Sequence, residues 1–237
     1  CVNDENREDR GIGTMDFERI IPMPETLRIE DGSRTHNAIN LVLTAMNGEN
    51  EYSHPLVDEF IGKKQKSSGF VEQFAVEMAA FNSHCLSNCS VSKEERERYF
   101  KYDDEKKLIK LGIQAITNYL KYKSITWYDW SIANWGTKWN AYDFAEYSGG
   151  NTIGFYTAWN APVPVICKLS EMYPDVLITH NFADEDIVSN CGCIEYKGGE
   201  IITDNTDMPY DEARKFANSL WGWSDEDESY DSGPSFV

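Results

Sequence analysis

The sequence predicts an α+β fold, in which helices pack against an antiparallel or mixed β-sheet. The C-terminal half alternates strand-like and helix-like segments, whereas the N-terminal half is mostly helical with one strand-like segment. The chain has 237 residues, of which 41% are hydrophobic and 13% aromatic, so it can bury a substantial core. This order of elements favours an α/β sandwich with a split β-α-β arrangement of the ferredoxin-like kind, interrupted by a mostly helical insertion.

One strand-like segment lies near the N-terminus. Met15–Ile21 alternates apolar and polar residues enough to predict a short strand. Pro22 and Pro24 follow it, and proline ends a strand because it has no N–H to donate to the ladder. Residues 48–70 lack a periodic pattern and predict a loop.

Helical periodicity dominates residues 35–125, which are predicted to form the insertion. The predicted helices cover 35–47, 70–81, 92–101 and 106–123. Ser33 or Thr35 can cap the first helix, and Asn47-Gly48 can end it, because glycine readily adopts the left-handed conformation of a C-cap. Ser92, followed three residues later by Glu95, predicts a capping box at the start of the third helix.

The C-terminal half is predicted to contain a strand and a helix, then three strands, and a final helix. The predicted strands cover 152–159, 176–182, 194–196 and 200–203, and the last two flank Lys197-Gly198-Gly199 as a hairpin. Pro162 and Pro164 can open a helix that runs to about residue 172, and a final helix covers 211–221. The predicted organisation is an N-terminal loop and strand (1–34), a helical insertion (35–125), the C-terminal part of the sandwich (126–223) and an acidic flexible tail (224–237).

The charge balance excludes one class of partner. With 22 basic and 40 acidic residues the formal net charge is −18, which repels nucleic-acid phosphates, so we expect no direct binding to DNA or RNA. No apolar run is long enough to span a membrane, and no signal peptide is visible. We therefore expect a cytoplasmic protein. The alternative is a lipoprotein anchored through Cys1, because mature bacterial lipoproteins begin with a lipidated cysteine.

The six cysteines predict reduced thiols rather than a disulfide framework. Cys167 lies in an apolar helical pattern, where a free cysteine behaves as a small hydrophobic residue. His84, with Cys85, Cys89, Cys191 and Cys193, has enough soft ligands for a zinc ion, but the spacing matches no zinc motif. We expect no metal and no cofactor.

A dense tryptophan block is the first candidate site. Trp135, Lys138, Trp139 and Asn140 place aromatic rings beside a cation and an amide, a combination that suits a nucleotide, a sugar or a peptide. The structural alternative is that both tryptophans wedge a helix against the sheet while Gly136 makes a tight turn with positive φ.

An acidic loop is the second candidate. Asp184-Glu185-Asp186, with Asp143, could bind Mg²⁺ or Ca²⁺ through carboxylate oxygens, although no calcium-binding loop motif is present. The structural alternative is an ordinary acidic loop whose carboxylates pair with Lys138 or with a helix N-terminus. His180, on a predicted strand, is either a general base or a core histidine. The chain has no Gly-x-Ser-x-Gly motif and no phosphate-binding glycine loop, which argues against nucleophilic catalysis.

Four blocks of sequence occur in the same order as in one family. They are Phe17–Glu25 (FERIIPMPE), Asn134–Tyr142 (NWGTKWNAY), Thr157–Pro164 (TAWNAPVP) and Ala183–Ile187 (ADEDI). On these blocks the chain resembles the YubB-type ferredoxin-like domain proteins of phages, plasmids and other bacterial mobile elements. The resemblance spans residues 15–203 and implies the fold and the setting, but no activity. The first strand and helix of the family would precede residue 1, which leaves an open sheet edge that a second copy could fill.

The leading functional hypothesis is a non-enzymatic interaction module that engages a host or phage protein. Its candidate contact residues are Trp135, Lys138, Trp139, Asn140, Asp184 and Asp186. The alternative is a binder of a small, nucleotide-like ligand, or an enzyme, at a cleft formed by the same residues. A third interpretation is a DNA mimic, which needs the negative charge concentrated on one face.

Overall fold

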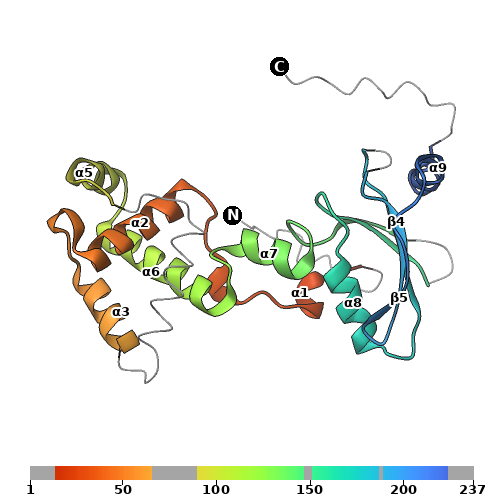
Figure 1. Cartoon of the computed structure of the whole chain (residues 1–237), viewed down its shortest axis with the longest axis horizontal. Coiled ribbons are helices and arrows are strands. Elements are labelled where there is room, and N and C mark those ends of the chain that lie inside the picture. Colours follow the sequence, from red (N-terminus) through yellow and green to blue (C-terminus); the bar gives the residue numbers. More distant parts are fainter. Residues whose placement is uncertain (1–13, 66–89, 147–150, 187–188, 224–237) are drawn as a thin grey trace, which may run out of the picture. The chain divides into compact units, whose positions relative to one another are not determined.

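The computed structural model describes residues 14–65, 90–146, 151–186 and 189–223, and it confirms the predicted α+β class (Figure 1). The chain divides into two compact units. The first contains residues 1–4 and 23–130, and the second contains residues 5–22 and 131–237. Each unit has its own cluster of buried apolar side chains. The segment 35–125 falls inside the first unit, whereas residues 5–22 join the C-terminal half in the second.

The described part of the first unit is helical. Its elements are η2 (Glu25–Leu27), α2 (Ser33–Asn47), η3 (Glu49–Glu51), α3 (Pro55–Gln65), α5 (Lys93–Tyr102) and α6 (Glu105–Tyr122). Apolar side chains of α2 and α6 form the centre of its core, and the largest of those that are almost completely buried are Ile39, Leu41, Val42, Ile109 and Ile116.

The closest approach of α2 and α6 is at Gly112. A Cβ atom added to Gly112 would fall against the carbonyl oxygen of Ala38 and would lie 2.7 Å from Cγ2 of Val42. These distances leave no room for a side chain, so glycine allows the two helix backbones to approach each other. The core of the unit depends on that approach.

Local sequence signals set most helix ends as predicted, but the predicted cap of α2 by Ser33 or Thr35 was wrong, because its N-cap is Gly32 and no side chain caps it. The Oγ of Ser92 accepts a hydrogen bond from the backbone N–H of Glu95 at 3.2 Å, and the Ser92 N–H donates to the Glu95 carboxylate at 2.9 Å. The predicted capping box of α5 is therefore confirmed. The helix α2 ends at Gly48, which has φ 64°, and α6 covers the predicted segment 106–123.

The prediction of a loop over 48–70 was wrong for its central part, which forms α3. Pro55 occupies the first position of that helix, where its missing N–H costs nothing. Val57 and Phe60 are buried in the core, and this tertiary contact stabilises a helix with a weak local signal. The predicted helix over 70–81 lies outside the described residues.

The second unit contains two antiparallel sheets in its described part. β1 (Tyr142–Glu146) pairs with β2 (Ile153–Tyr156), and a separate sheet has the order β3 (Ile178–Phe182), β4 (Gly192–Lys197), β5 (Glu200–Asn205). The helices are α1 (Phe17–Ile20), the end of α7 (Trp127–Trp135), α8 (Val163–Met172) and α9 (Tyr210–Trp221). The predicted β4–β5 hairpin, α8 and α9 are confirmed, whereas β1 was not predicted.

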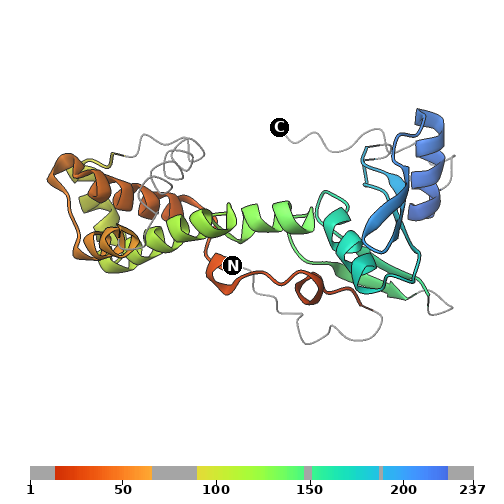
Figure 2. The same cartoon turned by 60° about the horizontal axis from the view of Figure 1, so that its bottom comes forward.

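Helix α8 covers one face of the three-stranded sheet (Figure 1, Figure 2). Tyr196 and Ile194 of β4 are buried in this layer, as are Val165 and Ile166 of α8. The backbone N–H of Gly199, in the β4–β5 turn, donates to the Oγ of Ser170 at 2.9 Å and ties the hairpin to the helix. Helix α9 packs at the opposite end of the strands, where Ala213 and Ala217 cluster with Cys191.

The prediction of a strand over Met15–Ile21 was wrong, because Phe17–Ile20 forms the short helix α1. The side chain of Asp16 caps this turn by accepting from the N–H of Glu18 at 3.1 Å. Phe17 is completely buried, with its ring 5.9 Å from that of Trp135 and 6.0 Å from that of Phe155. These contacts come from distant parts of the sequence, so the alternation of residues in this segment did not reveal them.

Candidate functional site

The turn that follows α7 brings the tryptophan block against the loop between β2 and α8. Gly136 has φ 78°, as the turn prediction required, and a Cβ there would lie 2.9 Å from Cδ of Pro164. The Oγ1 of Thr137 is buried and donates to the carbonyl oxygen of Ala158 at 2.7 Å. The two loops are thus fixed to each other by steric fit and by a buried hydrogen bond.

Trp135 lies in the core of the second unit. Only 3% of its surface is exposed, and its Nε1–H donates to the carbonyl oxygen of Ile21 at 2.9 Å. Its ring packs edge-on against Phe17. A buried tryptophan with a satisfied N–H holds elements together, so this ring is not presented to a partner.

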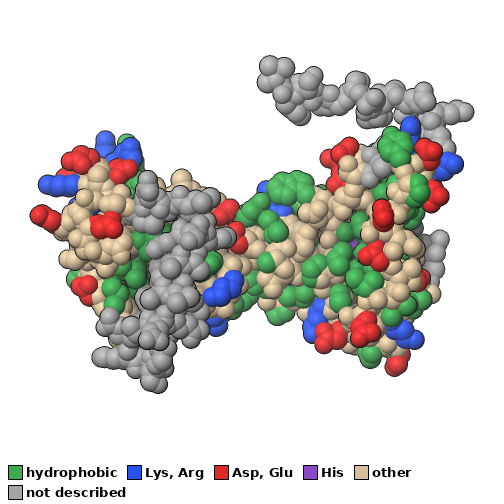
Figure 3. All heavy atoms as spheres, in the orientation of Figure 1, with side chains coloured by type: hydrophobic (Ala, Val, Ile, Leu, Met, Phe, Trp, Pro, Cys, Tyr) green, Lys and Arg blue, Asp and Glu red, His purple; other side chains and the backbone are tan. Residues whose placement is uncertain are grey.

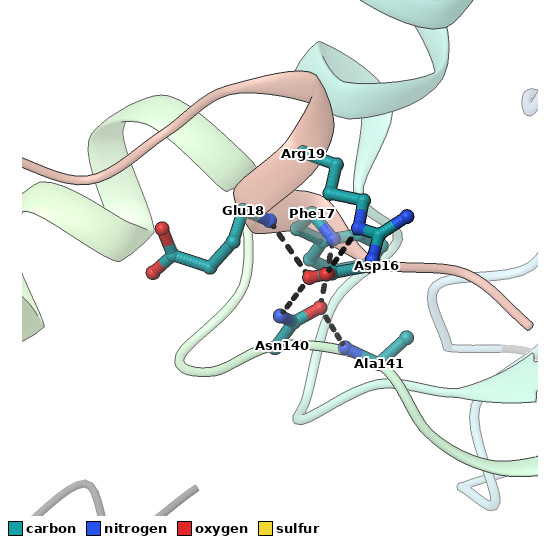
Figure 4. Close-up of polar contacts among 6 residues, drawn as sticks. All are labelled: Asp16, Phe17, Glu18, Arg19, Asn140 and Ala141. Carbon is teal, nitrogen blue, oxygen red and sulfur yellow. Dashed lines mark hydrogen bonds and ion pairs between the residues drawn. The ribbon is translucent and has the colours of Figure 1, made fainter. Parts of the chain in front are cut away.

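Asn140 is the centre of a polar network at the start of α1 (Figure 4). Its Oδ1 accepts hydrogen bonds from the N–H groups of Phe17 and Ala141, each at 2.9 Å. Its Nδ2 donates to Oδ1 of Asp16, also at 2.9 Å. All of these contacts are within the protein, and they anchor the segment that carries α1 to the chain leading into β1.

Lys138 and Trp139 lie at the surface together with Trp159, a residue that the sequence analysis did not select. The Nζ of Lys138 is 4.9 Å from the ring centroid of Trp139 and 4.5 Å from that of Trp159. Both distances are within the range of a cation–π interaction. Trp139 is 40% exposed and Trp159 61% exposed, so two indole rings flank one ammonium group at the surface. We call Lys138, Trp139 and Trp159 the indole–lysine site.

The backbone of Trp159 is held in an unfavourable conformation. Its φ is 69°, a left-handed value that a bulky residue rarely adopts. Three hydrogen bonds maintain the turn: Thr157 Oγ1 to the Asn160 carbonyl at 2.8 Å, Asn160 N–H to the Ala158 carbonyl at 2.9 Å, and Asn190 Nδ2 to the Trp159 carbonyl at 2.9 Å. These hydrogen bonds therefore hold the backbone of Trp159 in its left-handed conformation.

Asp184 and Asp186 shape the loop that supplies Asn190. The Asp186 N–H donates to the Asp184 carboxylate at 3.0 Å, and the hydroxyl of Ser189 donates to the Asp186 carboxylate at 3.0 Å. The Asp184 N–H donates to the Asn190 carbonyl at 3.2 Å. These hydrogen bonds connect Asp184 and Asp186 to the residues next to and including Asn190, whose side chain donates to the Trp159 carbonyl.

Hydrophobic side chains reach the surface around the loops that follow α7 and β2, on the face drawn in Figure 3. Trp139 and Trp159 belong to these loops. The signal that could have identified Trp159 was its place in the block Thr157–Pro164, next to two prolines that restrict the loop. Because Trp159 is far from Lys138 in the sequence, no sequence pattern indicated that the two side chains are in contact.

Burial shifts the pKa values of His180, Cys191 and Cys193 in the second unit. His180 is buried under α8, and burial lowers its pKa to about 4, so the ring is neutral at pH 7. Burial raises the pKa of the Cys191 thiol, and burial together with the charge of Glu195 raises that of Cys193. Both thiols are therefore weak nucleophiles at neutral pH.

No three His, Cys, Asp or Glu side chains gather as a set of metal ligands in the part of the chain that the structure describes. His84, Cys85 and Cys89, which the zinc hypothesis required, lie outside the described residues. Within the same ranges, no helix is both long and apolar enough to cross a membrane.

The sheet and covering helices of the second unit define an α+β domain, and comparison with known families shows what this part of the chain is similar to. Residues 134–231 match the model of a family described as "ferredoxin-like domain in Api92-like protein". This is a ferredoxin-like domain family of unknown function, and the match covers less than half of the chain. The comparisons with curated proteins and with solved structures found no match.

Proposed function

We propose that the second unit is a non-enzymatic protein-binding module and that its contact surface is the indole–lysine site. The observation that supports this proposal is the position of the Lys138 ammonium between two exposed indole rings. Tryptophan is enriched among the residues that dominate binding energy, because one ring buries a large area at little cost in conformational entropy.

The rigidity of the site also supports binding. Trp159 stands on a turn with three hydrogen bonds, and the turn carrying Lys138 is wedged against Pro164 by Gly136. A surface that is already ordered loses less entropy when a partner binds. The strained φ of Trp159 costs folding free energy without filling the core, which is the pattern of a residue retained for a task other than stability.

The resemblance to mobile-element proteins suggests the class of partner. We propose a host or phage protein in a bacterial cell, which presents apolar side chains to the indoles. Asp184 and Asp186 belong to this proposal as positioning residues, because their loop holds Asn190 and through it Trp159. Trp135 and Asn140 support the fold on which the site stands.

Affinity capture from nuclease-treated bacterial lysate, followed by mass spectrometry, tests this proposal. We expect one protein to be enriched by the wild-type chain and lost with Trp159→Ala or Lys138→Ala. Tyr210→Ala is the matched control, because Tyr210 is 64% exposed on α9 and lies outside the site. Trp135→Ala is unsuitable since that residue is buried. Equal capture by all variants would refute the assignment of the surface.

Two indoles around an ammonium also suit a small anionic aromatic ligand such as a nucleotide. If the lysate gives no captured protein, tryptophan emission should be titrated with ATP and GTP, using the same three variants. Quenching that requires both Trp159 and Lys138, and not Tyr210, would establish a ligand-binding site in place of the protein-binding one.

A further inference from the structure

Strand β5 forms one edge of the three-stranded sheet. It pairs with β4 on one side, and among the described residues no strand pairs with its other side. The side chains of the central strand β4 alternate between buried and half-buried, whereas five of the six residues of β5 are exposed. An unpaired edge presents a row of backbone N–H and C=O groups that can pair with another chain.

Two consecutive isoleucines on this edge face solvent. Ile201 is 48% exposed and Ile202 57% exposed. The ladder with β4 pairs Tyr196 with Ile201 and Glu195 with Thr203, so Ile202 is an extra residue in a bulge. A bulge re-aims the side chains beside it, which explains why neighbouring isoleucines are both at the surface. Natural edges are protected by lysine, by proline or by a bulge, and β5 has the bulge but neither lysine nor proline.

We propose that β5 pairs with the β5 strand of a second copy of this chain, antiparallel and about a twofold axis. The full-length register places Glu200 opposite Asn205 and Ile201 opposite Asp204, with Thr203 and the bulged Ile202 at the centre of the interface. No carboxylate faces another carboxylate in this register. Glu200 faces an amide that can donate to it.

The register predicts that substitutions of opposite charge at Ile201 affect association differently. Sedimentation equilibrium on the full chain can test this prediction. The buffer contains 150 mM NaCl and a reductant, so that no disulfide between chains contributes. A ladder of six residues on each strand buries less than the ~1,200 Å² of a stable interface. We therefore expect weak, reversible dimerisation that becomes detectable at protein concentrations on the order of 100 µM. Ile201→Glu puts two carboxylates opposite Asp204 residues and should weaken association about tenfold. Ile201→Lys puts two ammonium groups there and should preserve it.

Tyr102 supplies the control for net charge, because it is 79% exposed in the first unit. Tyr102→Glu and Tyr102→Lys should differ little in association. The dimer would be overturned by a wild-type chain that stays monomeric at that concentration. The edge and register would be overturned if the two Ile201 variants associated equally, or if the Tyr102 pair reproduced their difference. Trp159→Ala should leave association unchanged, so this result is independent of the proposed binding site.

Discussion

Asn140 shows how much a single amide can decide at the scale of one residue. Because it donates to Asp16 and accepts from two backbone N–H groups, no other side chain of its size satisfies all three partners. Asn140→Asp removes the donor and places a second carboxylate beside Asp16. We expect a loss of about 1–3 kcal/mol in the free energy of unfolding.

Urea unfolding followed by tryptophan fluorescence measures this loss. Asn181→Asp, at an exposed position of β3, is the matched control and should change stability by less than about 0.5 kcal/mol. Equal stability of the two variants would contradict the structural role given to Asn140.

His180 makes stability depend on pH. Its pKa is about 4 in the folded protein because of burial, against about 6.5 in an unfolded chain. The unfolded state therefore binds more protons between these values, and stability falls as pH decreases from 6.5 towards 4. The slope from this one group is up to about 1.4 kcal/mol per pH unit.

The variant His180→Phe isolates that contribution, since Phe182 already provides an aromatic neighbour 5.1 Å from the histidine ring. At pH 7.5 we expect the free energies of unfolding of wild type and variant to differ only by a constant amount. Below pH 6.5 this difference should change, because the variant loses less stability as pH falls. Parallel pH profiles would show that His180 does not titrate as the structure implies.

At the scale of elements, the sequence predicted best what local chemistry determines. The capping box of α5, the long helix α6 and the β4–β5 hairpin depend on neighbouring residues, and each was predicted close to its observed position. α1 and α3 depend on burial against distant residues, so their segments were assigned to a strand and a loop.

The contacts of the candidate site likewise include some that the sequence predicted and some that it did not. A cation beside aromatic rings was predictable at Lys138 and Trp139, which are adjacent in the chain. The contact with Trp159 arises from the packing of two loops, and the burial of Trp135 arises from Phe17 and Ile21. No periodicity or spacing carries that information, because tryptophan is equally suited to a core and to a surface.

Two glycines in helices offer opposite tests of element packing. Gly112→Ala should lower stability by about 1–3 kcal/mol, because its methyl group would collide with the backbone of α2 at Ala38. Gly62→Ala, in α3, has no atom within 4 Å of the added Cβ. It should raise stability by about 0.5–1 kcal/mol, since alanine favours the helix.

Thermal unfolding followed by circular dichroism at 222 nm measures both variants. Because the same substitution is made in each helix, intrinsic helix propensity acts in the same direction at both positions. A Gly112→Ala variant as stable as wild type would mean that α2 and α6 are farther apart than described.

At the scale of the whole molecule, the dominant property is the net charge of −18. Like charges repel more strongly in the compact state, and salt screens this repulsion. We expect the urea midpoint to rise when NaCl is increased from 10 to 200 mM. A midpoint that falls would mean that attractive ion pairs outweigh the repulsion.

The same charge predicts no retention of duplex DNA at about 150 mM salt, which a filter-binding assay would check.

The backbone of Trp159 also has an evolutionary consequence. Glycine at this position would relieve on the order of 1 kcal/mol of strain, so selection for stability alone would favour the loss of the ring. A library of random residues at position 159, sorted once for thermal resistance and once for partner capture, should therefore yield different winners. Under the proposed function, a heat-resistant descendant of this protein would first lose partner binding at this position.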